Sequence, residues 1–121
     1  MKYRYLVTQP DLNAHGTLHG GILMKWVDEA CGMEARLATG GVCATRHIRD
    51  IDFRSTARLG DIISIEVVVS KTGRTSITFS AFIFNIFSFT VCFIMNSIFY
   101  RFKKVTTLYN SIIIINFFKI F

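Results

Sequence analysis

The residues best suited to chemistry lie between positions 11 and 36, where a polar turn, a pair of glycines and an amphipathic helix follow one another. The turn carries Asp11, Asn13 and His15, so it can aim an amide or an imidazole at one point. Gly20 and Gly21 stand where the helix should begin, and the N–H groups of a first helical turn attract developing negative charge. Such a set could hold a carbonyl oxygen as it becomes an oxyanion, although the turn alone is also typical of an ordinary loop.

The helix that follows carries one ambiguous carboxylate. From residues 22 to 37 the apolar residues recur at steps of three and four, which is the period of one helical face. The expected buried stripe consists of Leu23, Val27, Ala30, Met33 and Leu37, while Lys25, Glu29, Glu34 and Arg36 are expected to point elsewhere. Asp28 lies at the border of this stripe. Such a carboxylate is either a solvated surface charge or a group held in a cleft.

Strands are expected on both sides of this helix. Residues 2–7 alternate in polarity before the helix, and after it residues 42–54, 62–70 and 76–80 do the same. The alternation changes phase within 42–54, which indicates a bulge or a strong bend. This order predicts an α+β domain with a long central helix packed on one face of a curved antiparallel sheet.

Several separated motifs occur in an order that resembles one family. They are D-L-N-A-H-G at 11–16, H-G-G at 19–21, W-V-D-E-A at 26–30, D-F at 52–53, G-D at 60–61 and G-R-T-S at 73–76. Together they resemble the hotdog-fold acyl-CoA thioesterases, also called acyl-CoA hydrolases, over residues 3–80. The resemblance implies the hotdog fold, with its curved sheet wrapped around the helix.

The resemblance also implies an activity and its residues. In this family an acid on the central helix and an asparagine from the loop before it act together across a subunit interface. These roles fall on Asp28 and Asn13, with the amides near Gly20 and Gly21 as oxyanion donors. The expected reaction is hydrolysis of acyl-CoA to a fatty acid and CoA by a homodimer or a higher oligomer. No metal or other cofactor is expected.

Coenzyme A would need its own contacts. The turn from residue 71 to 76 offers cations and hydroxyls suited to phosphate, namely Lys71, Arg74, Thr75 and Ser76. Arg54 and Ser55 are further candidates by family position. A G-R-T turn can equally be a plain hairpin. Among the histidines, we expect a loop or substrate contact from His15, and structural roles for His19 and His47.

Composition excludes other classes. The net charge of +6 arises largely after residue 80, where there are basic residues but no acid, and no nucleic-acid-binding motif accompanies it. We therefore expect no nucleic-acid partner. The three cysteines form no metal-binding pattern and indicate thiols in a reducing compartment. The first residues lack an apolar signal region, so a cytoplasmic location is expected.

The C-terminal part departs from the family pattern. We assign residues 1–85 to the hotdog domain, which is incomplete if the later strands are missing, and 86–121 to a divergent apolar tail. Three alternatives remain for the residues after 80: an aberrant terminus, the last strands of the sheet in 81–100, or a membrane segment over 81–100. Alternative functions are accordingly a non-catalytic remnant that binds acyl groups and a membrane-attached protein.

Overall fold

The computed structural model describes residues 1–88 and 90–102. Strand β1 (Lys2–Leu6) and the short helix η1 (Gln9–Asp11) precede the long helix α1 (Gly20–Thr39). Four strands follow: β2 (Cys43–Phe53), β3 (Ile62–Thr72), β4 (Ser76–Asn85) and β5 (Thr90–Phe102). The predicted order of strand, helix and further strands is confirmed.

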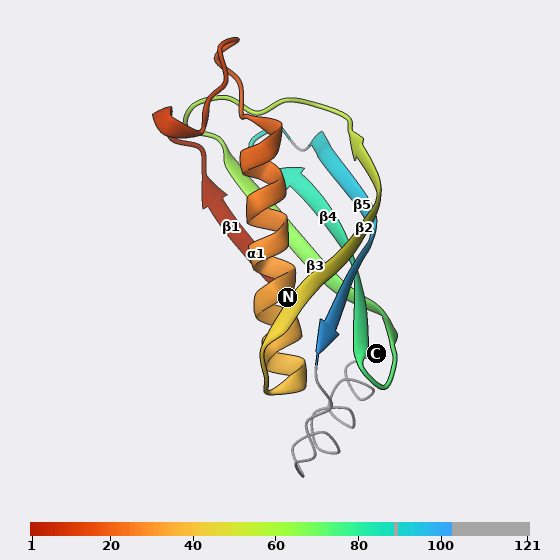
Figure 1. Cartoon of the computed structure of the whole chain (residues 1–121). Coiled ribbons are helices and arrows are strands. Elements are labelled where there is room, and N and C mark those ends of the chain that lie inside the picture. The colour runs from red at the N-terminus through yellow and green to blue at the C-terminus, as the bar shows by residue number, and fades with distance from the viewer. Residues whose placement is uncertain (89, 103–121) are drawn as a thin grey trace.

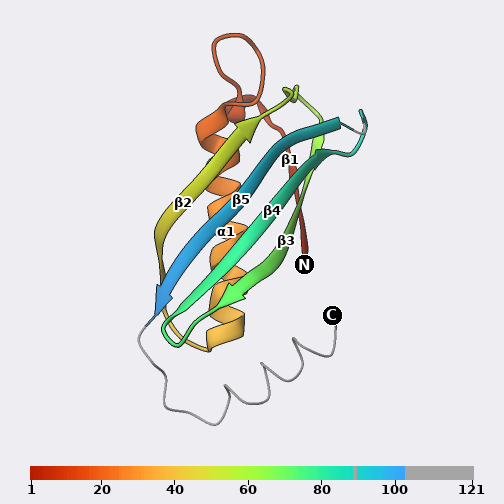
Figure 2. The ribbon, with the colours of Figure 1, turned by 90° about the vertical axis from the view of Figure 1, so that its right-hand side faces the viewer.

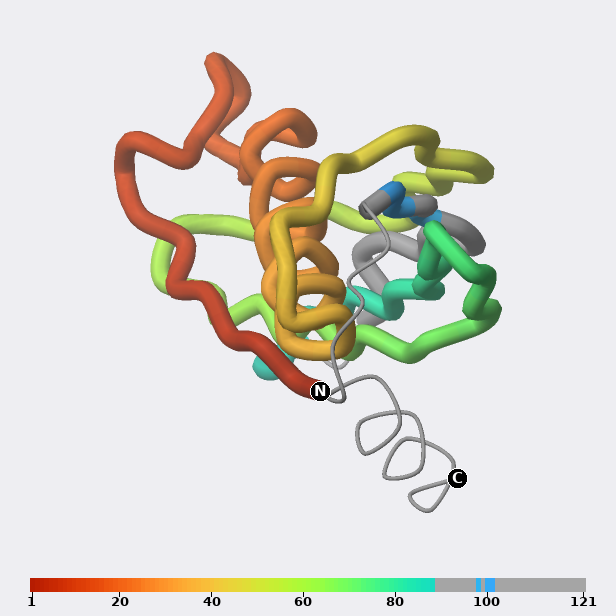
Figure 3. Tube along the Cα trace, turned by 60° about the horizontal axis from the view of Figure 1, so that its bottom comes forward, coloured from red at the N-terminus to blue at the C-terminus, as the bar shows by residue number. Residues whose placement is uncertain are grey.

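All five strands form one antiparallel sheet in the order β1-β3-β4-β5-β2, so β1 and β2 are its edges. Helix α1 lies along the concave face, and the strands curve around it (Figures 1 and 2). The view in Figure 3 shows the helix flanked by β1 on one side and β2 on the other. This is the predicted α+β arrangement of a central helix wrapped by a curved sheet.

The core between helix and sheet explains the strand pattern. Ile63, Ile65 and Val67 of β3 are buried, as are Ile77 and Phe79 of β4, in agreement with the predicted alternation. Alternate residues of a strand point to opposite faces, so these side chains all meet the helix. Burial of this set against α1 fixes the register of the central strands.

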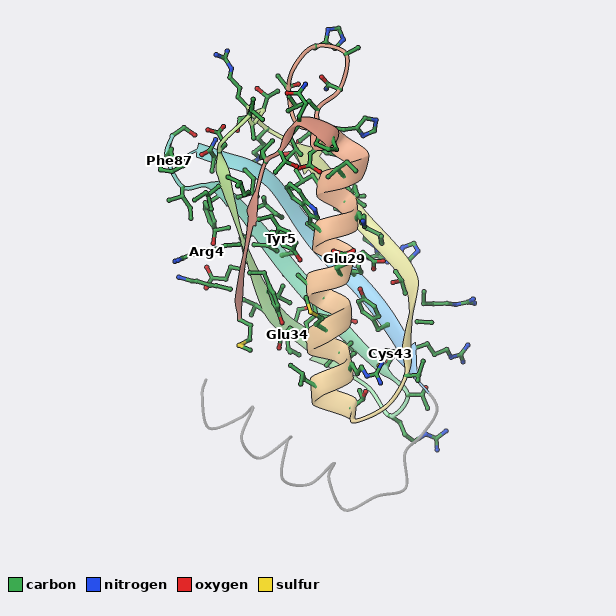
Figure 4. All side chains as sticks on the ribbon, turned by 90° about the vertical axis from the view of Figure 1, so that its left-hand side faces the viewer. Arg4, Tyr5, Glu29, Glu34, Cys43 and Phe87 are labelled. Carbon is green, nitrogen blue, oxygen red and sulfur yellow. The ribbon has the colours of Figure 1, made fainter. Side chains whose placement is uncertain are left out.

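The predicted face of α1 is partly wrong. Met33 and Leu37 are 43% and 61% exposed, whereas Glu34 is only 5% exposed. The buried face instead includes the small residues Cys31 and Ala35, which let the helix lie close to the sheet. Glu34 can be buried because Tyr3 on β1 donates a hydrogen bond to its Oε1 atom. Figure 4 shows Glu34 on the side of α1 that faces β1.

Two irregularities bend β2. The pairing with β5 shifts register between Thr45 and His47, and Asp50 has a φ of +56°. Both lie within residues 42–54, where the change of phase predicted a bulge or a strong bend. The bends let the edge strand follow the helix from its C-terminal end back to its start.

Strand β5 lies between β4 and β2, so residues 90–102 supply the last strand of the sheet. This matches the alternative in which late residues complete the sheet. Among the described residues, no helix is both long enough and apolar enough to cross a membrane. The division of the chain after residue 85 stays a prediction, since residues 103–121 lie outside the described part.

Candidate active site

The Asp28 side chain is half-buried in the middle of α1, on the side that faces β2 and β5. Its Oδ1 atom accepts a hydrogen bond of 2.6 Å from the Thr45 hydroxyl and one of 2.7 Å from the Tyr100 hydroxyl. Thr45 and Tyr100 are directly opposite one another in the β2–β5 pairing. A pair of hydroxyls from neighbouring strands therefore holds one oxygen of the carboxylate.

The other oxygen of Asp28 is treated differently. Within residues 1–88 and 90–102 no hydrogen bond reaches Oδ2, and no Lys, Arg or His forms an ion pair with the carboxylate. A carboxylate oxygen without a donor can accept a hydrogen bond from a water molecule. Of the two interpretations that the sequence left open, a solvated surface charge or a held group, the contacts favour the held group.

Tyr100 is itself well suited to hold this carboxylate. The side chain is 2% exposed and packs edge-on against Phe79, with ring centroids 6.0 Å apart. Burial is the main cause that raises the pKa of Tyr100 well above its ordinary value, and the hydrogen bond to Asp28 is the second. A hydrogen bond with Thr45 lowers this pKa. The phenol thus keeps its proton and remains a donor.

Asn13 belongs to a different cluster within the same chain. Its Oδ1 atom accepts from the N–H groups of His15 and Thr17, and its Nδ2 donates to the Thr17 hydroxyl at 3.0 Å. These contacts close the loop before α1. The neighbouring Asp11 caps η1 by accepting from the backbone and hydroxyl of Thr8. One chain therefore does not bring the Asn13 amide to Asp28.

The two glycines also lie at the helix start. The N–H of Gly21 donates to Nδ1 of His19 at 2.9 Å, which makes His19 the N-cap of α1 and gives it a structural role. The N–H of Gly20 has no hydrogen-bond partner among the described residues. A Cβ at Gly20 would lie 3.2 Å from the Phe53 ring, so glycine lets the end of β2 approach the helix.

Gly20 and Asp28 are eight residues apart on one helix, which corresponds to about 12 Å along its axis. A group bound at Oδ2 of Asp28 is therefore out of reach of the Gly20 amide of the same chain. The sequence-predicted residues form two clusters: Asp28 in the middle of α1, and Asn13 with Gly20 and Gly21 at its start.

The residues expected to bind coenzyme A are also separated. Arg54 and Ser55 follow β2 at the helix-start end, where Arg54 pairs with Asp52 in an exposed ion pair of 2.8 Å. The turn with Lys71 and Arg74 joins β3 to β4 at the opposite end of the sheet (Figure 1). Strand β2 spans about 33 Å between these levels.

The turn at the far end is tightly built. The Gly73 N–H donates to the Ser76 carbonyl, and a Cβ at Gly73 would lie 2.5 Å from Ser76 Oγ. Lys71 and Arg74 are exposed, while Thr75 and Ser76 are half-buried. The exposed cations can therefore meet an anion, and the glycine leaves room for the Ser76 hydroxyl.

Thr45 and Tyr100 were not identified as site residues from the sequence. Thr45 follows Asp28 by 17 positions and Tyr100 by 72, so only the pairing of β2 with β5 brings them together. Tyr100 also lies in the part of the chain assigned to the divergent tail. No local pattern marks either residue.

Comparison with known proteins bears on this site. The family model described as the thioesterase superfamily matches residues 15–86. An acetyl-coenzyme A thioesterase of Mus musculus is 37% identical over 68 residues, which cover 56% of this chain and 12% of that protein. An uncharacterized acyl-CoA thioester hydrolase of Buchnera aphidicola is 34% identical over 73 residues, covering 60% and 54%. The chain thus spans an eighth to a half of these relatives.

Solved structures share the fold. A hexameric thioesterase from Yersinia pestis has a TM-score of 0.78 at 24% identity, with 82% of each chain covered. A hexameric hotdog fold thioesterase of Campylobacter jejuni has a TM-score of 0.75 at 22% identity, covering 86% and 81%. An acyl-CoA hydrolase from Staphylococcus aureus, in complex with butyryl coenzyme A and coenzyme A, has a TM-score of 0.74 at 24% identity, covering 84% and 61%. The predicted hotdog fold is confirmed.

Proposed function

This chain belongs to the thioesterase superfamily, and on that premise we propose that it hydrolyses acyl-CoA thioesters to a fatty acid and CoA. The observation that carries the proposal is the Asp28 carboxylate, held through Oδ1 by two hydroxyls while Oδ2 has no partner among the described residues. Similar proteins are named acetyl-coenzyme A thioesterase and acyl-CoA thioester hydrolase, which supports a coenzyme A thioester as substrate.

We propose that Asp28 acts as a general base. Its Oδ2 takes a proton from water while the hydroxide adds to the carbonyl carbon of the thioester. The resulting tetrahedral intermediate carries a negative oxygen, which requires fixed N–H donors. The intermediate then expels the CoA thiolate, and the acyl group leaves as a carboxylic acid. The thiolate takes up the proton that Asp28 received and becomes the thiol.

The oxyanion donors are proposed to come from a second copy of the chain. Asn13 and the Gly20 amide lie at the start of α1, too far from Asp28 of their own chain. Approach of a partner in the opposite direction would bring its helix start to the middle of this helix. The proposed site thus combines Asp28 of one chain with Asn13 and Gly20 of the partner subunit.

Strand β2 is the edge best suited to such pairing. Nearly all of its residues are exposed, including the apolar Ile51 and Phe53. Antiparallel pairing of two β2 strands about Ile48 would place Thr45 opposite Ile51 of the partner subunit, about 7 Å from its Phe53. Because Phe53 lies against Gly20, the helix start of one chain would then lie near Asp28 of the other.

The same pairing rationalises the two groups of expected coenzyme A contacts. It would set the 71–76 turn of one chain at the level of Arg54 in the other, so the separated cations could act on one ligand. Since coenzyme A carries several phosphates, contributions from two chains would suit it. We propose this arrangement for Arg54, Ser55, Lys71, Arg74, Thr75 and Ser76.

The proposal is tested by thiol release from acyl-CoAs of several chain lengths, with the wild type and Asp28→Asn compared side by side. We expect the wild type to release thiol and the variant to lose at least about 10²-fold in kcat, because an amide cannot take the proton. Asn keeps an Oδ1 acceptor for Thr45 and Tyr100, so the fold should be retained. Activity within a few-fold of wild type would remove Asp28 from the mechanism, and an inactive wild type would favour a non-catalytic acyl-binding role.

A further inference from the structure

The Tyr100 hydroxyl is buried, yet packing alone does not require it. A phenylalanine would fill the same space against Phe79, and a buried tyrosine hydroxyl must find a polar partner. The acceptors of this hydroxyl are Oδ1 of Asp28 at 2.7 Å and the Asp28 backbone carbonyl at 2.8 Å. Both belong to the residue that we propose as the general base.

A phenol has one proton, so only one of these two contacts is a full hydrogen bond at a time. The charged carboxylate is the stronger acceptor and takes the proton preferentially. The close carbonyl holds the hydroxyl over the same turn of α1. Tyr100 is thereby fixed relative to the helix that carries the base.

Thr45 completes the arrangement. It donates to the same Oδ1 atom from the strand opposite Tyr100, so two donors converge on one oxygen. Two hydrogen bonds to one oxygen fix the plane of the carboxylate. One oxygen of the Asp28 side chain therefore accepts two hydrogen bonds, and the other accepts none from the described residues.

From this geometry we propose that Tyr100 is a positioning residue for the hydrolysis. It fixes the plane of the Asp28 carboxylate by holding one oxygen, so that the other oxygen faces the attacking water. The inference rests on the proposed function, because it concerns the same carboxylate. It also assigns a role in the site to β5, a strand whose sequence departs from the family pattern.

The experiment compares Tyr100→Phe with Tyr3→Phe. Both changes delete one tyrosine hydroxyl that donates to a carboxylate of α1, but Tyr3 donates to Glu34 and not to Asp28. We expect Tyr100→Phe to lower kcat about 10- to 100-fold with KM within a factor of two, because the base is misoriented while substrate contacts remain. Tyr3→Phe should leave kcat near wild type.

The pH profile gives a second readout that lost packing would not change. Removal of a donor to the carboxylate disfavours its charged form, so the acidic limb of kcat/KM should move to higher pH in Tyr100→Phe only. Thermal denaturation shows whether each variant is folded. An equal loss in both variants, or wild-type kcat and pH profile in Tyr100→Phe, would overturn the inference while leaving the hydrolase proposal intact. Retained activity in Asp28→Asn would instead overturn the hydrolase proposal.

Discussion

The two oxygens of Asp28 differ in their surroundings, and this difference determines what the residue can do. Oδ1 is occupied by Thr45 and Tyr100, while Oδ2 faces no donor among the described residues. A carboxylate fixed in this way needs no reorganisation when it accepts a proton. The residue that resembles the family acid therefore also has the local contacts of a base held in place.

Cys31 is the second residue whose surroundings lead to a measurable effect. Burial first, and then the negative charges of Asp28 and Glu34, raise the pKa of its thiol from 9.0 to about 12. Because the folded-state pKa is the higher one, this contribution to stability is complete below pH 9. It is lost as the pH rises from 9 towards 12.

We expect the free energy of unfolding to fall with pH above 9, and to fall less steeply in Cys31→Ala. Urea denaturation between pH 8.5 and 10 measures the two slopes, and comparison of slopes removes the constant cost of the smaller side chain. The measurement stops at pH 10 because the pKa values of Tyr3, Tyr5 and Tyr100 are also raised on folding. Above pH 10 these tyrosines also change the free energy of unfolding. Identical slopes would show that the buried thiol is not responsible.

At the scale of elements, α1 is the frame on which the site depends, and Gly32 is its weakest internal position. A glycine inside a helix costs about 0.5–1 kcal/mol relative to alanine. A Cβ at Gly32 would lie 3.7 Å from the Tyr100 hydroxyl and 3.9 Å from its ring, which is ordinary van der Waals contact. An alanine therefore fits beneath Tyr100 without moving it.

We expect Gly32→Ala to raise the free energy of unfolding by about 0.5–1 kcal/mol with kcat unchanged. Gly32→Leu is the contrasting variant, because a longer side chain would push Tyr100 away from Asp28 and lower kcat. Chemical denaturation and thiol release measure both effects. A destabilised alanine variant would mean that the Tyr100 hydroxyl lies closer to Gly32 than a Cβ distance of 3.7 Å allows.

The sequence predicted these elements well where periodicity reflects burial. In β3 the alternation of Ile63, Ile65 and Val67 matches their burial because the strand has one face against the helix. The stripe of α1 was less accurate, since Glu34 is buried through a hydrogen bond from β1 that no local pattern shows. The helical period predicts that one face of the helix is buried. Which residues belong to that face also depends on contacts with residues that are distant in the sequence.

The candidate site was predictable to a similar extent. Asp28 and Asn13 could be identified because their motifs resemble a family, whereas Thr45 and Tyr100 depend on strand pairing over long sequence separations. Tyr100 was further obscured by the composition around it. A residue that positions another side chain is harder to identify from the sequence than the residue that it positions.

At the scale of the whole molecule, one chain holds the two halves of the proposed site in two separate places. Asp28 with its two hydroxyls lies midway along the sheet, and Asn13 with Gly20 lies at one end. The exposed edge β2 offers a way to join two sheets and to cover the edge of each. Hydrolysis should therefore require two chains, each supplying what the other lacks.

Complementation between two inactive variants tests this requirement most directly. Asp28→Asn removes the proposed base, and Asn13→Asp removes the Nδ2 donor while keeping the Oδ1 acceptor that closes the loop. Each variant alone should be inactive in the thiol-release assay. When the two are co-refolded in equal amounts, about one site in four combines an intact Asp28 with an intact Asn13 from the other chain.

We expect the mixed sample to recover about a quarter of the wild-type kcat per site, with recovery absent when the variants are mixed without refolding under conditions that prevent subunit exchange. A mixed sample that stays as inactive as its components, while the wild type hydrolyses acyl-CoA, would contradict a site shared between two chains.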